Sequence, residues 1–585
     1  MRIEVRRIDG VVDPAAVAVT LDTGTGDVIW LDSARAGSNG LSHTGGRRGQ
    51  GQGDGQASDQ AGDQADRARW SIVAAVDGPF GATFVHDRGL PEVAAQPAAE
   101  PWFRQVIDAI SGRRAADGGV GRDGGLGRDG SGGVPDEQDE FFAVLEQVLD
   151  ATPAVAGAPV PGCGFALGWI GYIGYELGRE PRGPMRFADG HPDGALRFVD
   201  RAVLLDARDG VCWVLALVDD TGSTSASSQG ASATNRTWLA ATAVAVGDLA
   251  AETRPTALSG DATNPDLPTT GLPAAGRVSR ARYERDVDAC RAEIRDGNAF
   301  QVCLTTSFSV AAPRAVAGTP RSGVSDARLS GTEASETGVP GPLARDPEFA
   351  EYLRLRTADP VPFGSFVRLG RVTIASRSPE RFVAVSAAGR VVAEPIKGTR
   401  PRGRTPGEDD GLLQELTTSA KDRAENVMIV DLLRNDLLRT AIPGSVRVER
   451  LCAIESYATV HQMVSTVVGT VRPGVSPAAV VRAAFPPGSM TGAPKISAMA
   501  IADRLEGAPR GVYSGAIGYF STDGAVDLAV AIRTLVSVRH ADAGVVRSLG
   551  AGGAVTWSSS AHDEADEVET KTRSVLGTLG SAAVW

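Results

Sequence analysis

The chain has 585 residues, and its 71 acidic and 59 basic side chains give a formal net charge of −12. Hydrophobic residues make up 42% and charged residues 22%, a composition typical of globular proteins that excludes a chain disordered throughout. The acidic balance argues against a nucleic-acid partner, because such proteins usually carry a basic stripe. The length predicts two to four domains, or one large domain with insertions.

No stretch of about 18 uncharged apolar residues occurs, so no membrane-spanning segment and no membrane partner are expected. The opening residues, MRIEVRRIDGVVD, lack the apolar core of a signal peptide. The five cysteines are an odd number without a CxxC pair, which predicts neither a disulfide framework nor a zinc site. These features together predict a cytoplasmic protein.

Four blocks of low-complexity sequence hold much of the 71 Gly. Such segments bury too little apolar surface to offset the entropy of ordering them, so they are predicted to be flexible, disordered insertions or linkers. The blocks are residues 36–68, 111–138, 220–276 and 312–346.

Structured stretches are predicted between these blocks. Residues 17–32 and 70–78 resemble strands, and residues 141–150 form an amphipathic helix. Residues 196–218 resemble two strands joined at an Asp-Gly turn. From about residue 279, helices and strands occur without regular βαβ alternation, which favours an α+β class with antiparallel sheets.

Residues 419–438, SAKDRAENVMIVDLLRNDLL, carry an apolar repeat with helical spacing at Val427, Val430, Leu433 and Leu437. We therefore predict a helix over this segment.

Two pairs of carboxylates are spaced three residues apart, so each pair shares a helix face. They are Asp422 with Glu425 and Glu564 with Glu567, and Lys571 lies one turn beyond the second pair. Two such helices together could supply oxygen ligands for Mg²⁺, which keeps other positions for water or ligand oxygens. The alternative is that both are solvated helix faces.

Lys397 lies in VVAEPIKGTRPRG, residues 391–403, between an apolar segment and a predicted turn. A lysine at the end of a strand can be desolvated, which lowers its pKa and frees a nucleophilic amine. The alternative is an exposed loop lysine.

Two further stretches are rich in small residues. Residues 485–507, FPPGSMTGAPKISAMAIADRLEG, predict a turn leading into a helix that begins near Lys495, and backbone N–H groups at such a turn can hold an anion. Residues 548–558, SLGAGGAVTWS, would let a ligand approach the backbone closely. Ordinary packing is the alternative for both.

Taken in order, these stretches form a longer pattern: GNAFQVCLT, SRSPERF, PIKGTRPRG, KDRAENVMIVDLLRNDL, ATVHQMVSTVVGTV, FPPGSMTGAPK, RGVYSGAIGYFS, AVAIRTL, GAGGAVTWSSS and DEADEVETKTRSVL. The pattern resembles the chorismate-utilising enzymes, which include component I of anthranilate synthase and of aminodeoxychorismate synthase, isochorismate synthases and salicylate synthases. It covers residues 280–580, and GWIGYIGYE at 168–176 resembles an earlier signature of the same family.

The resemblance implies an anthranilate synthase component I-like fold, with two antiparallel β-sheets packed as a sandwich and helices outside. It also implies an N-terminal component I-like region over residues 1–276 and a chorismate-binding catalytic region over 277–585, both contributing to one structure.

The resemblance implies a Mg²⁺ ion that holds the ring carboxylate of chorismate, with Glu425 and Glu564 as matching ligands and Asp422 and Glu567 beside them. Arg533 and Tyr513 match residues that grip the enolpyruvyl carboxylate, a task that suits the planar fork of arginine. Further implied substrate contacts are Ser489, Gly552, Thr399 and Lys495, and His461 matches a histidine near the reacting ring. For Lys495 a helix-start charge, and for His461 a purely structural role, remain alternatives.

Lys397 in PIKGT resembles the aminodeoxychorismate synthases, whereas anthranilate synthases typically read PIAGT. The resemblance implies that Lys397 attacks C2 of chorismate and that Glu380 protonates the departing C4 hydroxyl. Gln301 stands where the water-adding members carry a lysine, and Cys303 replaces a usual Asn. The implied activity is formation of 4-amino-4-deoxychorismate in para-aminobenzoate and folate biosynthesis. The alternatives are anthranilate synthase component I, a synthase of secondary metabolism, and a non-catalytic homologue.

Such enzymes receive ammonia from a glutaminase, which uses an activated cysteine. The only comparable site here, Cys163 in PGCG, lacks the surrounding pattern. We therefore expect chorismate as substrate and ammonia from a separate glutaminase subunit.

Overall fold

The structure is a computed structural model. It describes residues 1–24, 26–33, 69–117, 141–155, 160–179, 190–220, 225–252, 272–312, 342–457, 459–542 and 544–585, without the side chains of 113–117. The predicted insertion at 36–68 lies outside the described residues, as do 118–138, 253–271 and 313–341 of the other three, so flexibility there stays a prediction.

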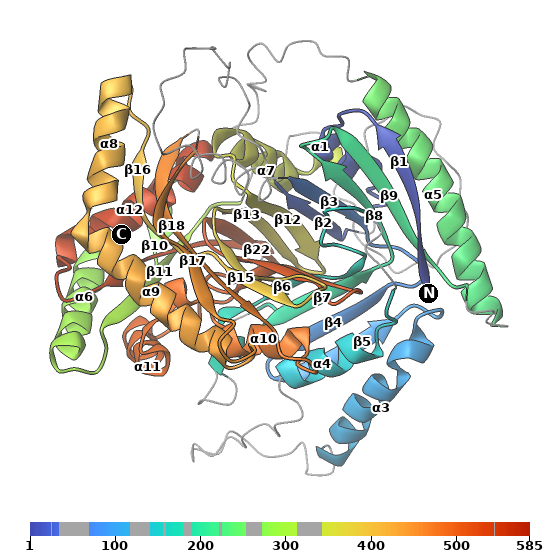
Figure 1. Ribbon diagram of the computed structural model, residues 1–585, viewed down its shortest axis with the longest axis horizontal. Helices are drawn as coiled ribbons and strands as arrows, with labels where there is room; N and C mark the ends of the chain where they lie inside the picture. Colours follow the sequence, from blue (N-terminus) through green and yellow to red (C-terminus); the bar gives the residue numbers. More distant parts are fainter. Residues whose placement is uncertain are drawn as a thin grey trace.

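Two large sheets form the centre of the molecule (Figure 1). The larger has 13 strands, antiparallel except where β10 pairs with β24. In spatial order its strands are β1 (Arg2–Asp9), β9 (Val211–Val218), β8 (Arg201–Asp206), β3 (Trp70–Ala75), β2 (Val28–Asp32), β12 (Phe363–Leu369), β13 (Val372–Ser378), β22 (Thr534–His540), β23 (Gly544–Val555), β11 (Gln301–Ser309), β10 (Ala274–Gly276) and β24 (Ala583–Val584), with β19 (Gly492–Ala493) on β11.

The second sheet has 11 strands, and all of its pairings are antiparallel. In spatial order they are β16 (Ile396–Pro401), β18 (Val460–Thr470), β15 (Arg390–Ala393), β14 (Arg381–Val385), β21 (Val526–Val530), β20 (Ala516–Ser521), β6 (Gly168–Ile173), β7 (Gly194–Val199), β4 (Ala82–Asp87) and β5 (Leu90–Ala95), with β17 (Arg447–Ser456) on β18. The predicted pair of antiparallel sheets is confirmed.

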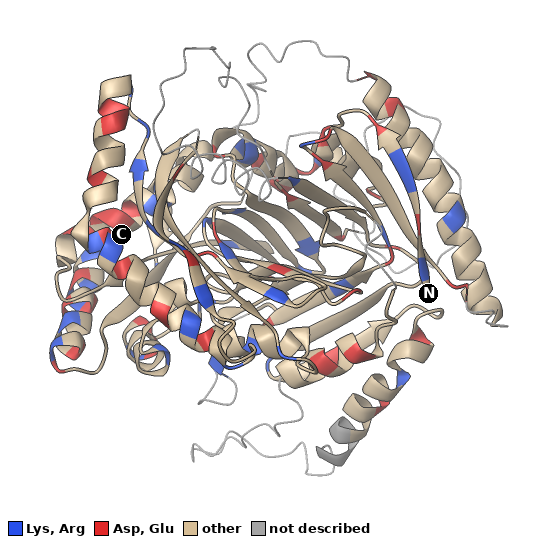
Figure 2. Cartoon of the chain, viewed as in Figure 1, with Lys and Arg blue, Asp and Glu red and all other residues tan. Residues whose placement is uncertain are grey.

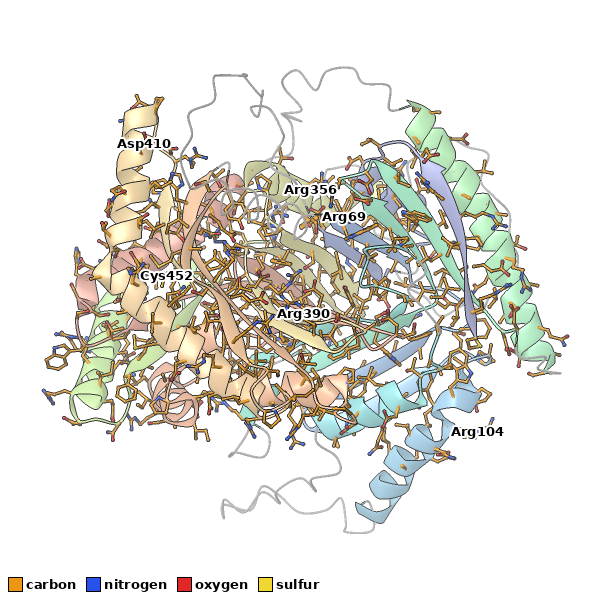
Figure 3. All side chains as sticks on the ribbon, viewed as in Figure 1. Arg69, Arg104, Arg356, Arg390, Asp410 and Cys452 are labelled. Carbon is orange, nitrogen blue, oxygen red and sulfur yellow. The ribbon has the colours of Figure 1, made fainter. Side chains whose placement is uncertain are left out.

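Helices surround the two sheets in Figure 1, and Figure 3 shows side chains filling the interior. They are α1 (Pro14–Thr20), α3 (Glu100–Asp117), α4 (Phe141–Ala151), α5 (Ala226–Glu252), α6 (Arg280–Arg295), α7 (Pro347–Ala358), α8 (Pro406–Thr418), α9 (Ala420–Leu438), α10 (Pro477–Ala484), α11 (Lys495–Glu506) and α12 (Ala561–Thr578), with short 3₁₀ turns η2 (Tyr175–Arg179), η3 (Leu343–Arg345) and η4 (Gly488–Met490). Within the described residues, no helix is both long and apolar enough to cross a bilayer.

Each sheet joins strands from both predicted regions. Strand β2 pairs with β12 in the larger sheet, and β6 pairs with β20 in the smaller one. The boundary predicted near residue 277 therefore separates the two regions along the sequence, while in space they share both sheets.

The prediction that residues 220–276 are a disordered insertion is wrong for Ala226–Glu252, which form the long helix α5 against β9 and β1. The block looked like a linker because it is rich in Ala, Ser and Thr, but Ala is the strongest helix former. Asn235, Leu239 and Val246 are buried at helical spacing, so α5 has an internal face toward the sheet. Helix α3 likewise continues into the predicted 111–138 insertion, to Asp117.

Two local predictions also need correction. Residues 17–20, expected to be strand, belong to α1, because Asp13 accepts a hydrogen bond from the Ala15 N–H and Pro14 occupies the first helical turn. Residues 196–218 form three strands, β7, β8 and β9, and the Asp-Gly turn joins only the last two. Helices predicted over 141–150 and 419–438 are confirmed as α4 and α9, although Val427 is 45% exposed.

A cavity of about 550 Å³ lies between the two sheets. Its lining includes Asp32, Trp70, Phe363, Arg381 and Tyr519. None of the predicted catalytic, substrate-binding or metal-binding residues lines it, so the candidate site is elsewhere in the fold.

Candidate active site

Lys397 lies at a break in the pairing of β16 with β18. Ile396 pairs with Val464 and Thr399 with Gln462, so the register shifts across Lys397 and Gly398. Such bulges re-aim side chains at strand ends. Gly398 has φ +84°, and a Cβ there would lie 2.9 Å from Asp422 Cβ, so the turn packs directly on the start of α9.

Glu380 connects β13 to β14 and is 6% exposed. Burial raises the pKa of Glu380 to about 7, while the Ser489 hydroxyl and the charge of Lys397 oppose the rise. The fold thus brings together the acid Glu380, the amine of Lys397 and the hydroxyl of Ser489, although more than 100 residues separate Glu380 from Ser489. Near neutral pH the acid can both hold and release a proton.

Glu425 on α9 and Glu564 on α12 are the carboxylates that the structure leaves open to a cation. They are 9% and 2% exposed, and one oxygen of each, Glu425 Oε1 and Glu564 Oε2, is buried without a hydrogen-bond partner among the described residues. Glu564 Oε1 accepts a hydrogen bond from Ser559 (2.7 Å). A Cβ at Gly553 would lie 2.4 Å from Glu564 Oε2, so a glycine is needed beside this carboxylate.

A cation already lies between the two carboxylates. Lys421 Nζ is 3.9 Å from Glu425 Oε1 and 3.8 Å from Glu564 Oε1. Burial raises the pKa of both glutamates, and Lys397 and Lys421 oppose the rise at Glu425. Two buried carboxylates with unsatisfied oxygens fit Mg²⁺, which needs only a few protein ligands. The described part of the chain contains no cluster of three or more potential metal ligands, so this is no preformed cage.

The other two predicted metal ligands are engaged elsewhere. Asp422 accepts a hydrogen bond from Arg400 Nη2 (3.0 Å). Glu567 pairs with Lys571 (2.6 Å), whose charge lowers the pKa of Glu567. Lys571 also donates to the carbonyl oxygen of Gly552 (2.8 Å). In Figure 2, acidic and basic residues both occur along α9 and α12, the helices that carry these pairs.

Tyr513, Ser489 and Gly552, three of the predicted substrate contacts, lie on segments that meet at this site. The ring of Tyr513 is buried against Gly550, where a Cβ would come within 2.2 Å of it. Ser489 is buried in η4 and faces Glu380. Gly552 pairs with Thr305 across β23 and β11.

Arg533 is partly buried and Thr399 is exposed, unlike the three residues above. Arg533 lies between β21 and β22 with a side chain 24% exposed, and Nη1 is 3.4 Å from Asp359 Oδ2. Thr399 lies on β16, two residues after Lys397.

Lys495 is not available to substrate, so its predicted role as a substrate contact is wrong. Its Nζ donates to the carbonyl oxygens of Ala484 (2.6 Å) and Pro486 (2.9 Å) and pairs with Asp436 (2.8 Å). Two of its protons thus go to carbonyl oxygens, and the carboxylate of Asp436 balances its charge. Lys495 is 8% exposed and holds the start of α11 against α9.

His461 lies on β18 with both ring nitrogens occupied. Nδ1 is 2.7 Å from Ser456 Oγ, and Nε2 is 3.0 Å from Asp409 Oδ1. Asp409 is held in turn by Arg402 and by the Gly403 N–H. These contacts give His461 a structural setting in the described conformation, and its predicted catalytic role stays a prediction.

Sequence reasoning missed Lys421. It lies four residues before Glu425, a spacing that places the two side chains on one face of α9 and was the available signal. Cys303, by contrast, lacks the exposure and the lowered pKa of a nucleophilic cysteine. It is 3% exposed, and burial raises the pKa of its thiol.

Comparison with known proteins agrees with this geometry. The chain is 44% identical to an aminodeoxychorismate synthase of Streptomyces griseus over 420 residues, which are 72% of this chain and 51% of that protein. It is 32% identical to aminodeoxychorismate synthase component 1 of Salmonella typhimurium, over 75% of this chain and 83% of that protein. The chain therefore spans about half the length of the Streptomyces relative.

The structure superposes on anthranilate synthase component I of Streptococcus pneumoniae with a TM-score of 0.60 and 25% identity, over 87% of this chain and 92% of that one. This confirms the predicted fold. The model of the chorismate binding enzyme family matches residues 124–320 and 338–577, which include Lys397, Glu380, Glu425 and Glu564. The resemblance seen in the motifs is thus confirmed, and the chain belongs to the chorismate binding enzyme family.

Proposed function

We propose that the protein is an aminodeoxychorismate synthase that converts chorismate and ammonia to 4-amino-4-deoxychorismate. The observation that carries the proposal is the placement of Lys397 beside the buried acid Glu380, whose pKa is raised to about 7. The relatives from Streptomyces griseus and Salmonella typhimurium, both named aminodeoxychorismate synthase, support it.

In the first step, the Lys397 ammonium gives up one proton to solvent, and its nitrogen forms a bond to C2 of chorismate as the bond between C4 and its hydroxyl breaks. Glu380 donates its proton to that hydroxyl, which leaves as water. A carboxylic acid with a pKa near 7 is suited to this transfer at neutral pH.

In the second step, ammonia forms a bond to C4 and the bond from C2 to the Lys397 nitrogen breaks, which restores the free lysine. Two successive displacements therefore place the amine at C4. A direct attack of ammonia at C2 would give the other regiochemistry, the one that leads to anthranilate.

Glu425 and Glu564 would hold Mg²⁺ through their unpartnered oxygens. When bound, Mg²⁺ supplies positive charge for the ring carboxylate of chorismate beside these two buried carboxylates. Lys421, between the same two side chains, would have to give way to the ion. Tyr513 and Arg533 would receive the enolpyruvyl carboxylate.

We further propose that ammonia comes from a separate glutaminase subunit and that the product enters para-aminobenzoate and folate synthesis. The relative named component 1 supports a partner component. The five cysteines are all buried and free, which supports a cytoplasmic location, where disulfides are rare.

Product analysis tests the proposal. The purified protein is incubated with chorismate, Mg²⁺ and ammonium ion, and the product is identified by mass and ultraviolet spectrum. We expect 4-amino-4-deoxychorismate. Anthranilate formed without an added lyase would refute the proposal, and turnover with glutamine as the sole nitrogen source would refute the separate glutaminase.

A further inference from the structure

The N-terminal motif GWIGYIGYE ends in a segment that is hydrogen-bonded to the loop carrying Tyr513. This loop, residues 507–515, joins α11 to β20 and is here called the Tyr513 loop. Strand β6 ends at Ile173, and the chain then turns through η2 directly against the loop. Since the loop has no regular secondary structure, its position depends on such contacts.

Glu176 makes the central contacts with the main chain of this loop. Its Oε1 accepts a hydrogen bond from the Arg510 N–H (2.7 Å), and its Oε2 accepts one from the Gly511 N–H (3.0 Å). The Tyr175 N–H donates to the Gly511 carbonyl oxygen (2.8 Å) in the opposite direction. Glu176 is 3% exposed, so the carboxylate has exchanged water for these two donors.

The side chain of Arg510 connects this loop to other segments around the candidate site. Its guanidinium lies 4.2 Å from the centre of the Tyr175 ring and forms a two-point pair with Glu506 (2.7 and 2.9 Å). It also donates to the carbonyl oxygens of Cys303 (2.8 Å) and Met490 (2.7 Å). Met490 follows Ser489, which faces Glu380, so one guanidinium ties β11 and η4 to the Tyr513 loop.

Tyr513 lies three residues after Arg510. Its ring is held against Gly550 of β23, and the Ser514 N–H donates to the Ala531 carbonyl oxygen (2.9 Å). The loop is therefore fixed by Glu176 on one side of Tyr513 and, on the other, by Ala531, the residue that follows β21. A shift of the Arg510 and Gly511 main chain would move the tyrosine.

We propose that Glu176 is a positioning residue of the chorismate site, acting through the main chain of Arg510 and Gly511 to place Tyr513. The inference rests on the proposed function, in which Tyr513 contacts the substrate. It gives the N-terminal region a direct part in the site, through a carboxylate that never touches the substrate.

The test compares Glu176→Gln with the wild-type protein. An amide keeps one acceptor but turns an NH₂ group toward a backbone N–H, so one of the two bonds is lost. We expect the KM for chorismate to rise on the order of 10-fold, as for loss of a hydrogen bond to a charged group, while kcat falls by less than about threefold. Glu351→Gln is the matched control, because Glu351 is equally buried and pairs with Arg547, which is not part of this loop. It should lower the unfolding temperature and leave KM unchanged.

A double-mutant cycle with Tyr513→Phe separates positioning from a merely structural role. If Glu176 acts through Tyr513, the double variant has nearly the KM of either single variant. Independent effects would instead multiply, to about 100-fold if Tyr513→Phe alone also raises KM about 10-fold, and that result, or an unchanged KM in Glu176→Gln, would overturn the inference. If Glu176→Gln does not fold, Glu176→Asp, which keeps the charge but is one methylene shorter, enters the same cycle. Wild-type protein that makes no 4-amino-4-deoxychorismate would refute the proposed function, whereas multiplying effects in an active enzyme refute only the role of Glu176.

Discussion

Two lysines in this chain occupy comparable sequence settings, each beside a glycine- and proline-containing turn, but their surroundings differ. Lys495 begins α11 with three acceptors around its ammonium, including the carboxylate of Asp436. Lys397 lies at a bulge in β16, and within the described residues its side chain makes no hydrogen bond or ion pair. Its charge instead acts on Glu380, Glu425 and Glu567, which come from three other elements.

The difference separates a lysine that stabilises the fold from one that is free to react. A fully hydrogen-bonded ammonium cannot lose a proton without leaving buried acceptors unsatisfied. Lys397 is only half-buried and acts on several of the described carboxylates without pairing with one of them, so its side chain is free to approach a ligand. The following substitutions test this contrast.

Lys397→Ala should have the largest effect on chemistry. We expect kcat to fall on the order of 10³-fold at pH 7, because the nucleophile is lost, while chorismate still binds. Steady-state kinetics and equilibrium binding of chorismate measure the two quantities. Turnover within a few-fold of wild type would remove the covalent role.

Lys495→Met should affect the fold instead. Removing one partner of a buried pair leaves Asp436 uncompensated, which costs about 3–5 kcal/mol of unfolding free energy. Urea denaturation measures the loss, and the double variant Lys495→Met with Asp436→Leu should recover part of it. If Lys495→Met kept full stability but lost chorismate binding, the structural assignment would be wrong.

Glu380→Gln should lower kcat on the order of 100-fold, because the amide cannot donate the proton. In the folded protein the pKa of Glu380 is raised to about 7. The protonated acid is therefore present below pH 7 and is lost as the pH rises through that value. The kcat of the wild-type enzyme should therefore decrease above about pH 7. A pH profile flat from 6 to 9 would contradict Glu380 as the acid.

Glu425→Gln and Glu564→Gln should each lower the apparent affinity for Mg²⁺ by roughly 10-fold, since each removes a charged ligand. Asp422→Asn is the matched control from the same helix, because Asp422 is paired with Arg400. Titration of activity with Mg²⁺ distinguishes the three. An unchanged titration for both glutamine variants would exclude these ligands.

Much of the fold was predictable from local pattern. The antiparallel sheets, α4 and α9 follow from periodicity and from the lack of βαβ alternation. Helix α5 was missed because composition was weighed above spacing, although Asn235, Leu239 and Val246 repeat at helical intervals. The pairing of β6 with β20, across more than 340 residues, has no local signal at all.

The candidate site, like the fold, was predictable from the sequence only in part. Motif resemblance indicated Lys397, Glu380, Glu425 and Glu564, and the structure brings them to one place. The resemblance could not indicate that Lys495 is paired with Asp436 and Asp422 with Arg400, because these pairs are formed by tertiary packing. Only the folded structure determines which charged side chains are paired within the protein and which are available to a ligand.

Protein mass spectrometry tests the central claim, that Lys397 is the nucleophile which directs the amine to C4. The protein is mixed with excess chorismate and Mg²⁺ without ammonia, quenched in acid and digested. We predict a peptide whose Lys397 carries the mass of one chorismate less one water. An unmodified Lys397, in a preparation that forms 4-amino-4-deoxychorismate once ammonia is added, would contradict the account.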